Sequence, residues 1–242
     1  MNYMIFNILS LLMKFRASFI TAIGVQDAVL TQTTLRVEAA LNSNGNVVTF
    51  RLREDGTKFS DQERKLLQGE SFMPVAASIK LSKYSKDGSG KNNANHIPST
   101  FVDPNVFSNT DEQSALNKVY QGDLSFIVNG SNSIDKMSTS LMRFAPENGV
   151  LAAAGTGQPV DLKAMYGGSY EGMGFTPLIT PFPLNGADDI SISLALGEGD
   201  ITGIAGPDAN LQNKVIVEVL GWKYKGNAIN SGSTTGFCTV PI

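Results

Sequence analysis

Apolar and polar residues alternate along much of this chain with a period of two, the spacing of half-buried β-strands. Residues 35–41 and 48–52 each place an apolar side chain at every second position, with charged residues such as Arg36 and Glu38 between them. Asn44-Gly45 separates the two runs, and this dipeptide favours the positive φ angles of a tight turn. The pattern predicts an antiparallel hairpin with one apolar face and one charged, wet face.

The same alternation continues further along the chain. In residues 75–84, one face of the expected strand carries Val75, Ala77, Ile79 and Leu81. Residues 122–130 form another such strand, and residues 187–200 and 213–226 are two strongly β-prone runs closed by Gly and Asp. Strands about ten residues apart with long polar loops predict a mainly β chain, a jelly-roll β-sandwich that occurs once or as two tandem rolls.

Two short helices interrupt the predicted strands. Residues 59–70 contain Ser60 followed by Glu63, the spacing of a capping box, and reach Gly69 at a suitable stop position. Residues 110–120 form the second short helix. Residues 86–99 contain almost nothing to bury and are expected to form a long exposed loop.

The N-terminus carries a helical rather than a strand pattern. Its apolar side chains recur at helical spacing and mark a candidate contact surface for a membrane or a partner subunit, formed by Ile5, Ile8, Leu9, Leu12 and Phe15. The run is too short to span a bilayer, and its basic residues follow the apolar part, unlike a secretory signal. The alternatives are a helix packed on its own domain, or translation that starts at Met13.

Composition shifts divide the chain into four expected regions. Residues 1–20 form the amphipathic helix or arm, and residues 21–145 form the first β-sandwich. A Gly-, Pro- and Ala-rich stretch then leads into residues 146–226, a second sandwich or a continuation of the first. Residues 227–242 are rich in Ser, Gly and Thr and are expected to form a C-terminal arm.

Charge and cysteine content restrict the possible partners. The 242 residues carry a net charge of −3, so a surface that binds nucleic acid directly is not expected. The lysines at 80, 83, 86 and 91 are interpreted as a solvated strand end and loop rather than a phosphate site. With Cys238 as the only cysteine, neither an internal disulfide nor a cysteine-based zinc site can form within one chain.

No set of residues predicts catalysis, a cofactor or a metal. His96 is the only histidine and is expected in an exposed loop. Residues 197–203 resemble a dinucleotide-binding glycine motif, but no helix follows to hold a pyrophosphate. Trp222 and Tyr224 share one strand face, where they could form a carbohydrate platform; the alternative, packing on the core or at a subunit contact, is favoured.

The last predicted strand also carries a resemblance. VIVEVLGWKYKG (215–226), an apolar strand that ends in glycine, an aromatic residue and basic residues, resembles the final strand of the major capsid proteins of tailless, membrane-containing icosahedral bacteriophages. The N-terminal helix is similar to the segment that those proteins turn toward an internal membrane. The resemblance covers about 30 residues and implies upright jelly rolls that assemble as trimers within a shell.

The expected function is therefore structural: a self-assembling coat subunit of a phage or virus, made in the host cytoplasm and located in the virion. Its partners are copies of itself and, through the N-terminus, an internal lipid membrane. Assembly needs no bond chemistry, and Trp222 and Tyr224 are candidate subunit contacts. The main alternative is a binding module such as a phage fibre, adhesin or lectin-like sandwich, and the third is an enzyme on a β scaffold.

Overall fold

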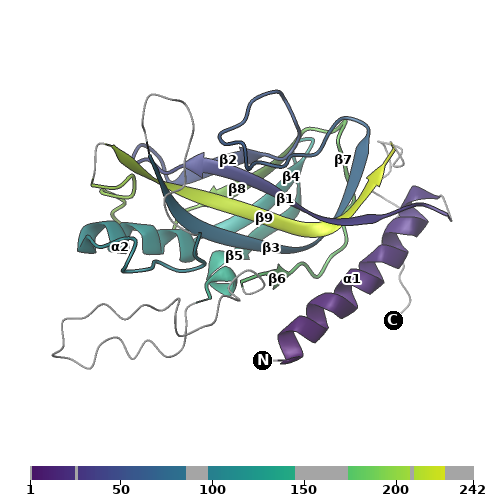
Figure 1. Ribbon diagram of the computed structural model, residues 1–242, viewed down its shortest axis with the longest axis horizontal. Helices are drawn as coiled ribbons and strands as arrows, with labels where there is room; N and C mark the ends of the chain where they lie inside the picture. Colours follow the sequence, from purple (N-terminus) through teal and green to yellow (C-terminus); the bar gives the residue numbers. More distant parts are fainter. Residues whose placement is uncertain (1, 25–26, 86–97, 145–173, 208–209, 227–242) are drawn as a thin grey trace.

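Two antiparallel sheets lie face to face and form the body of the protein (Figure 1). The computed structural model describes residues 2–24, 27–85, 98–144, 174–207 and 210–226. One sheet has the strand order β1 (Thr31–Ala40), β9 (Leu211–Lys225), β3 (Glu70–Ser85) and β6 (Thr176–Pro177), with β7 (Leu184–Asn185) also paired to β3. The other has the order β2 (Val47–Arg51), β8 (Ile190–Ala195), β4 (Asp123–Val128) and β5 (Ser131–Ser138).

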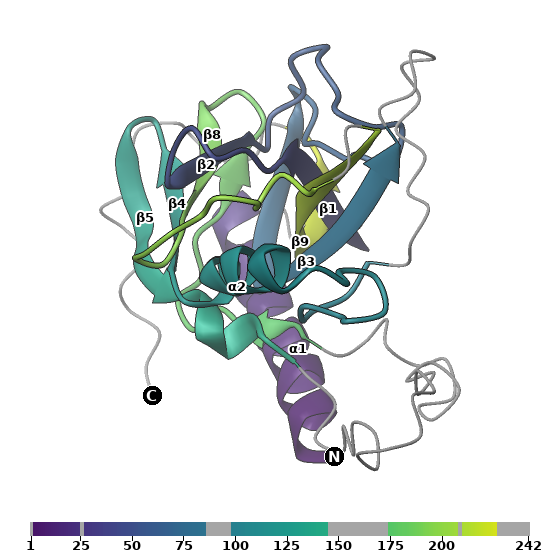
Figure 2. The ribbon, with the colours of Figure 1, turned by 90° about the vertical axis from the view of Figure 1, so that its left-hand side faces the viewer.

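The helices lie at the ends of this body. Figure 1 shows α1 (Asn2–Ile23) and α2 (Thr110–Asn117) at opposite ends of its long axis. Two short 3-10 turns, η1 (Lys118–Tyr120) and η2 (Thr139–Met142), flank strands β4 and β5. Figure 2 shows α2 lying across the end where the two sheets part. The chain is thus mainly β, and the expected helix at residues 110–120 is confirmed as α2 followed by η1.

The apolar core fills the space between the sheets. Alternate residues of β1, β3 and β9 face the other sheet, among them Val37, Ile79 and Val217. They meet Phe126 of β4 and Ile192 of β8, both fully buried. Burial at every second position of β4 and β8 follows from the two-residue period of a strand with one wet face.

Strand β3 is buried on both faces, and a β-bulge near Pro74 exchanges the residues that point to each face. Ala77, Ile79 and Leu81 face the core between the sheets, whereas Val75 packs with Met73 on the outer face. The expectation that Val75 shares a face with Ala77 is therefore wrong. The extra residue of a bulge breaks the alternation on which that expectation was based.

The expected hairpin of residues 35–41 and 48–52 does not form. β1 pairs with β9 and β2 pairs with β8, so the two strands belong to different sheets. Both apolar faces do point into the core, as the alternation predicts, but from opposite sides of it. Residues 41–46, with Asn44-Gly45, therefore cross from one sheet to the other.

The expected helix at residues 59–70 is also wrong, although its capping residues form the bonds of a helix start. The Glu63 side chain accepts a hydrogen bond from the backbone N of Phe59 at 2.6 Å, and Ser60 Oγ accepts one from Gln62 at 3.2 Å. Arg64 then forms a bridge with Arg36, and Leu66 forms one with Arg53. Pairing with strand edges thus replaces the helix after a single turn.

The C-terminal strands complete the sheets that the N-terminal half begins. β9 lies between β1 and β3, and β8 lies between β2 and β4. The strands described within residues 146–226 thus pair with strands of the N-terminal half in both sheets. The Gly-, Pro- and Ala-rich stretch expected to be a boundary (145–161), the C-terminal arm and most of the loop at 86–99 lie outside the described residues.

Candidate functional site

Helix α1 packs on its own sandwich along its C-terminal half. Leu12, Phe15, Phe19 and Ile23 form a second, smaller core with Met73 and Val75 of β3. Two of the five candidate contact residues, Leu12 and Phe15, are thus buried within the chain. The side chains of Ile5, Ile8 and Leu9 lie outside the described part of the molecule.

Trp222 and Tyr224 lie under the same helix. The indole Nε1 of Trp222 donates a hydrogen bond to the carbonyl oxygen of Leu12 at 2.7 Å, and the Arg16 guanidinium lies 5.9 Å from the indole ring centre. Both aromatic residues pack against the α1 core and are only partly exposed. Because the helix occupies the face of Trp222, this residue does not present an open platform to a sugar.

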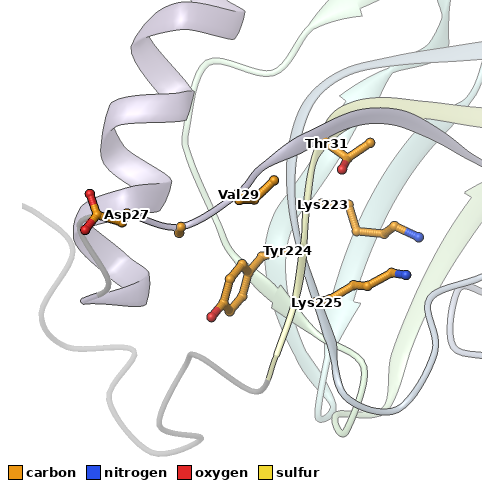
Figure 3. A pocket seen from close by; sticks show the side chains of 7 residues that line it. Asp27, Val29, Thr31, Lys223, Tyr224 and Lys225 are labelled. Carbon is orange, nitrogen blue, oxygen red and sulfur yellow. The ribbon is translucent and has the colours of Figure 1, made fainter.

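A cavity of about 480 Å³ lies beside these aromatics, between the end of β9 and the segment that joins α1 to β1. Figure 3 shows Lys223 and Lys225 pointing away from α1, with Tyr224 between them pointing to the other side. The Lys223 ammonium already pairs with the Glu70 carboxylate at 3.0 Å. The cavity is open, and its lining mixes apolar, acidic and basic side chains. These residues do not form an anion-binding site.

A row of charged side chains covers the rest of the outer face of the five-stranded sheet. The Lys214 ammonium lies 2.6 Å from the Glu38 carboxylate, and both side chains are fully buried. Arg36 contacts the same carboxylate at 2.6 Å and Glu218 at 3.3 Å, and Lys80 contacts Glu218 at 2.7 Å. This charge ladder, formed by Arg36, Glu38, Lys80, Lys214 and Glu218, crosses the three long strands β1, β9 and β3.

The basic members of the charge ladder lower the pKa of the Glu38 carboxyl. Burial acts to raise the pKa of this carboxyl, but the hydrogen bond and charge of Lys214, followed by those of Arg36, outweigh burial and hold the pKa below its usual range. Glu38 is therefore a charged, buried and fully paired group. Its position corrects the expectation that the charged face of residues 35–41 is wet.

The lysine cluster is likewise not a solvated loop where it is described. Lys80 belongs to the charge ladder, and Lys83 is buried beside Glu112 of α2. Lys86 and Lys91 lie outside the described residues. Both paired lysines sit on β3, whose two faces are covered, so their charges are matched by carboxylates rather than by water.

Two acidic residues next to strand β8 form structural hydrogen bonds. Asp188 accepts a hydrogen bond from the Asn129 side chain at 3.0 Å, and Asp200 accepts one from the Thr202 backbone at 2.7 Å. Within the described ranges, no group of three or more His, Cys, Asp or Glu side chains could hold a metal ion. His96 and Cys238 are not among the described residues.

Over the part of the chain that the structure describes, no helix is both long and apolar enough to cross a membrane. Comparison with known proteins gave no match, either to a family model or to a curated protein.

Proposed function

We propose that this protein is a self-assembling coat subunit of a virus or phage and that its sandwich is a single jelly roll. The observation that carries the proposal is the order of the strands. With β6 and β7 taken as one interrupted strand, eight strands form two sheets of four. Each sheet takes alternating members from the beginning and the end of the chain.

This order is what a jelly roll requires. A ribbon of four antiparallel strand pairs, folded over once, places the first strand beside the last and the second beside the next to last. The register of β1 with β9 and of β2 with β8 matches those two pairings. β3 and β4 then flank β9 and β8 on their other sides, as the same folding demands.

Jelly rolls also serve as lectin domains and metal-binding cupins, so the site must decide between functions. A cupin-type centre built on several histidines cannot form within a chain that has one. A sugar platform at Trp222 is disfavoured because α1 covers that ring. Assembly requires no such site, and it remains the function that the described residues support best.

Several exposed apolar side chains supply candidate contacts between copies of the chain. Ile179 and Val29 are the most exposed of them, at 89% and 82%. Leu12 and Phe15 are buried against the sandwich. The proposed contact with an internal lipid membrane is therefore made by residues before Leu12. The proposed partners are copies of the chain, as trimers within a virion shell.

Native mass spectrometry combined with negative-stain electron microscopy of the purified full-length protein tests this proposal. We expect closed oligomers or shells whose population grows with protein concentration. Ile179→Asp and Val29→Asp should reduce assembly, and Lys136→Glu, a change in the exposed edge strand β5, is the charge-altering control. A folded protein that stays monomeric at all accessible concentrations would overturn the proposal.

A further inference from the structure

Three polar side chains meet at the end of the core that α2 closes. Lys83 of β3 and Asn213 of β9 are direct cross-strand partners, so their side chains leave neighbouring strands on the same face. Glu112 of α2 reaches them from across the opening. The exposed fraction is 7% for Lys83, 0% for Asn213 and 1% for Glu112, so the cluster is closed to bulk water.

The local structure holds each member of this cluster in place. Asn109 caps α2, and its Oδ1 accepts hydrogen bonds from the backbone N of Asp111 and of Glu112, which fixes Glu112 in the first helical turn. The Asn213 amide donates to the carbonyl oxygen of Ile204 at 3.0 Å. The Lys83 ammonium lies 5.3 Å from the centre of the Phe107 ring. An apolar ring, a capped helix and a strand pair thus enclose the three groups.

One carboxylate oxygen contacts both nitrogens. Oε1 of Glu112 is 3.0 Å from Lys83 Nζ and 2.8 Å from Asn213 Nδ2, and Oε2 is 3.1 Å from the same Nζ. The amine and the amide can therefore be no further apart than the sum of those two Oε1 distances. An amine, an amide and a shared carboxylate are the groups needed to transfer the side-chain acyl group of an asparagine to the amine of a lysine, with release of ammonia.

We propose that Lys83 and Asn213 join through an intramolecular isopeptide bond, with Glu112 as the proton carrier. This modification site is independent of the proposed coat function, since it needs only the folded chain. It would link β3 to β9, the central pair of the five-stranded sheet. No oxidant, cofactor or second substrate is required.

The reaction balances within the cluster. Lys83 first gives one proton to Glu112, and the neutral amine then attacks the Asn213 Cγ, so that the carbonyl electron pair moves to Oδ1. Glu112 delivers its proton to Nδ2 and takes one from the attacking nitrogen. The bond from Cγ to Nδ2 breaks, the carbonyl re-forms, and ammonia leaves with the remaining proton as ammonium. The products are a secondary amide and the original carboxylate.

The unpaired carbonyl of the amide fits this role. Oδ1 of Asn213 is buried and has no hydrogen-bond partner among the residues that the structure describes, a costly arrangement for an oxygen that only serves the fold. When Glu112 holds the lysine's proton it becomes a donor, and rotation of the amide would let it bond Oδ1 and make Cγ more electrophilic. Exclusion of water also protects the tetrahedral intermediate from hydrolysis.

Intact-mass spectrometry of the folded full-length chain tests the proposal directly. We expect a loss of about 17 Da, the mass of ammonia, and a peptide pair joined through Lys83 and Asn213 after proteolysis. Lys83→Arg keeps the positive charge but cannot form the amide, and Glu112→Gln keeps the shape but cannot carry the proton, so both should keep the full mass. Lys80→Arg, which alters a lysine paired with Glu218, is the matched control and should still lose ammonia.

Cyclisation of an asparagine that precedes glycine, such as Asn129, also releases ammonia. Such a product would persist in Lys83→Arg, would yield no joined peptides and would hydrolyse at alkaline pH. That result overturns the proposal, as does a folded wild-type chain that keeps its full mass after long incubation. Retention of the joined peptides in Glu112→Gln would overturn the role of the carboxylate. If Lys83→Arg fails to fold, the wild-type mass and peptide map still decide.

Discussion

The buried pair of Glu38 and Lys214 offers a sharp test of the charge ladder. Glu38→Gln keeps the shape and one acceptor oxygen but removes the negative charge. Lys214, whose side chain is fully buried, then loses the carboxylate that lies 2.6 Å from its ammonium. Arg36 keeps its second carboxylate, Glu218, at 3.3 Å, so the damage falls mainly on Lys214.

The expected cost follows from that uncompensated charge. Removal of one partner from a buried ion pair destabilises proteins by about 3–5 kcal/mol, because the other charge stays desolvated. The remaining amide oxygen can still accept a hydrogen bond from Lys214, so we expect a loss near the lower limit, about 3 kcal/mol. The double variant Glu38→Gln/Lys214→Met removes the orphaned charge and should recover much of this loss.

Urea unfolding followed by circular dichroism measures the effect, with a change in midpoint and an unchanged slope. Glu54→Gln is the matched control, because Glu54 pairs with Lys58 at the surface at 3.4 Å and should cost less than about 0.5 kcal/mol. If Glu38→Gln lowers the free energy of unfolding as little as Glu54→Gln does, water reaches the charge ladder, and the predicted cost of an unpaired buried charge is refuted.

The pH dependence of stability gives a second readout of the same group. The pKa of Glu38 in the folded chain lies below its ordinary value of 4.5. The carboxylate therefore contributes its full stabilisation above about pH 4.5, and this contribution is lost as the pH falls through the lower, folded pKa. Glu38→Gln should flatten the stability profile in that acidic window. An equally steep profile in the variant would assign the acid sensitivity to other carboxyls.

Three further predictions address packing, backbone approach and ionisation. Phe19→Ala should destabilise the protein by about 3–5 kcal/mol in urea unfolding, since Phe19 of α1 is fully buried against β3, whereas Met13→Ala, at an exposed position, should stay within about 0.5 kcal/mol. Gly221→Ala should lower the thermal stability, because a Cβ there would overlap the Met73 carbonyl and keep β9 from approaching β3. At Gly45 a Cβ would meet no described atom within 4 Å, so equal thermal stability of Gly221→Ala and Gly45→Ala would contradict the prediction. Hydrogen bonds from the Thr57 hydroxyl and backbone lower the pKa of Asp55 to about 2. NMR titration of Thr57→Val should find a higher pKa for Asp55, and an unchanged pKa would exclude the hydroxyl as a cause.

Strand identity could be read from the sequence, but strand pairing could not. Alternation correctly places Phe50 and Leu35 on core-facing sides of two strands, yet it says nothing of which sheet each strand joins. Strand β5 gives no alternating signal, since all of its residues are exposed or only partly buried. The Asn129-Gly130 turn before it, with both φ angles positive, is the one local signal that could have found it.

The polar clusters were missed for a related reason. Arg36 and Glu38 alternate with apolar residues, which by itself indicates a wet face. Their partner Lys214 lies far away in the sequence, and only the register of β1 with β9 brings it near. Lys83, Glu112 and Asn213 likewise come from three separate elements. Each residue alone is typical of a surface, and only the pairing reveals that its charge or amide is buried.

The outer face of the five-stranded sheet explains why α1 and the charge ladder occur together. One half of that face is apolar around Trp222 and is covered by α1, whereas the other half carries paired charges. Apolar packing tolerates neighbouring arrangements, but a ladder of alternating charges fits only one register, because a slip by one residue turns every charge into the core. The charges therefore favour a unique pairing of β1, β9 and β3. Lys83 and Asn213 depend on that same register, so a slipped sheet would lose the contact that the proposed isopeptide bond requires.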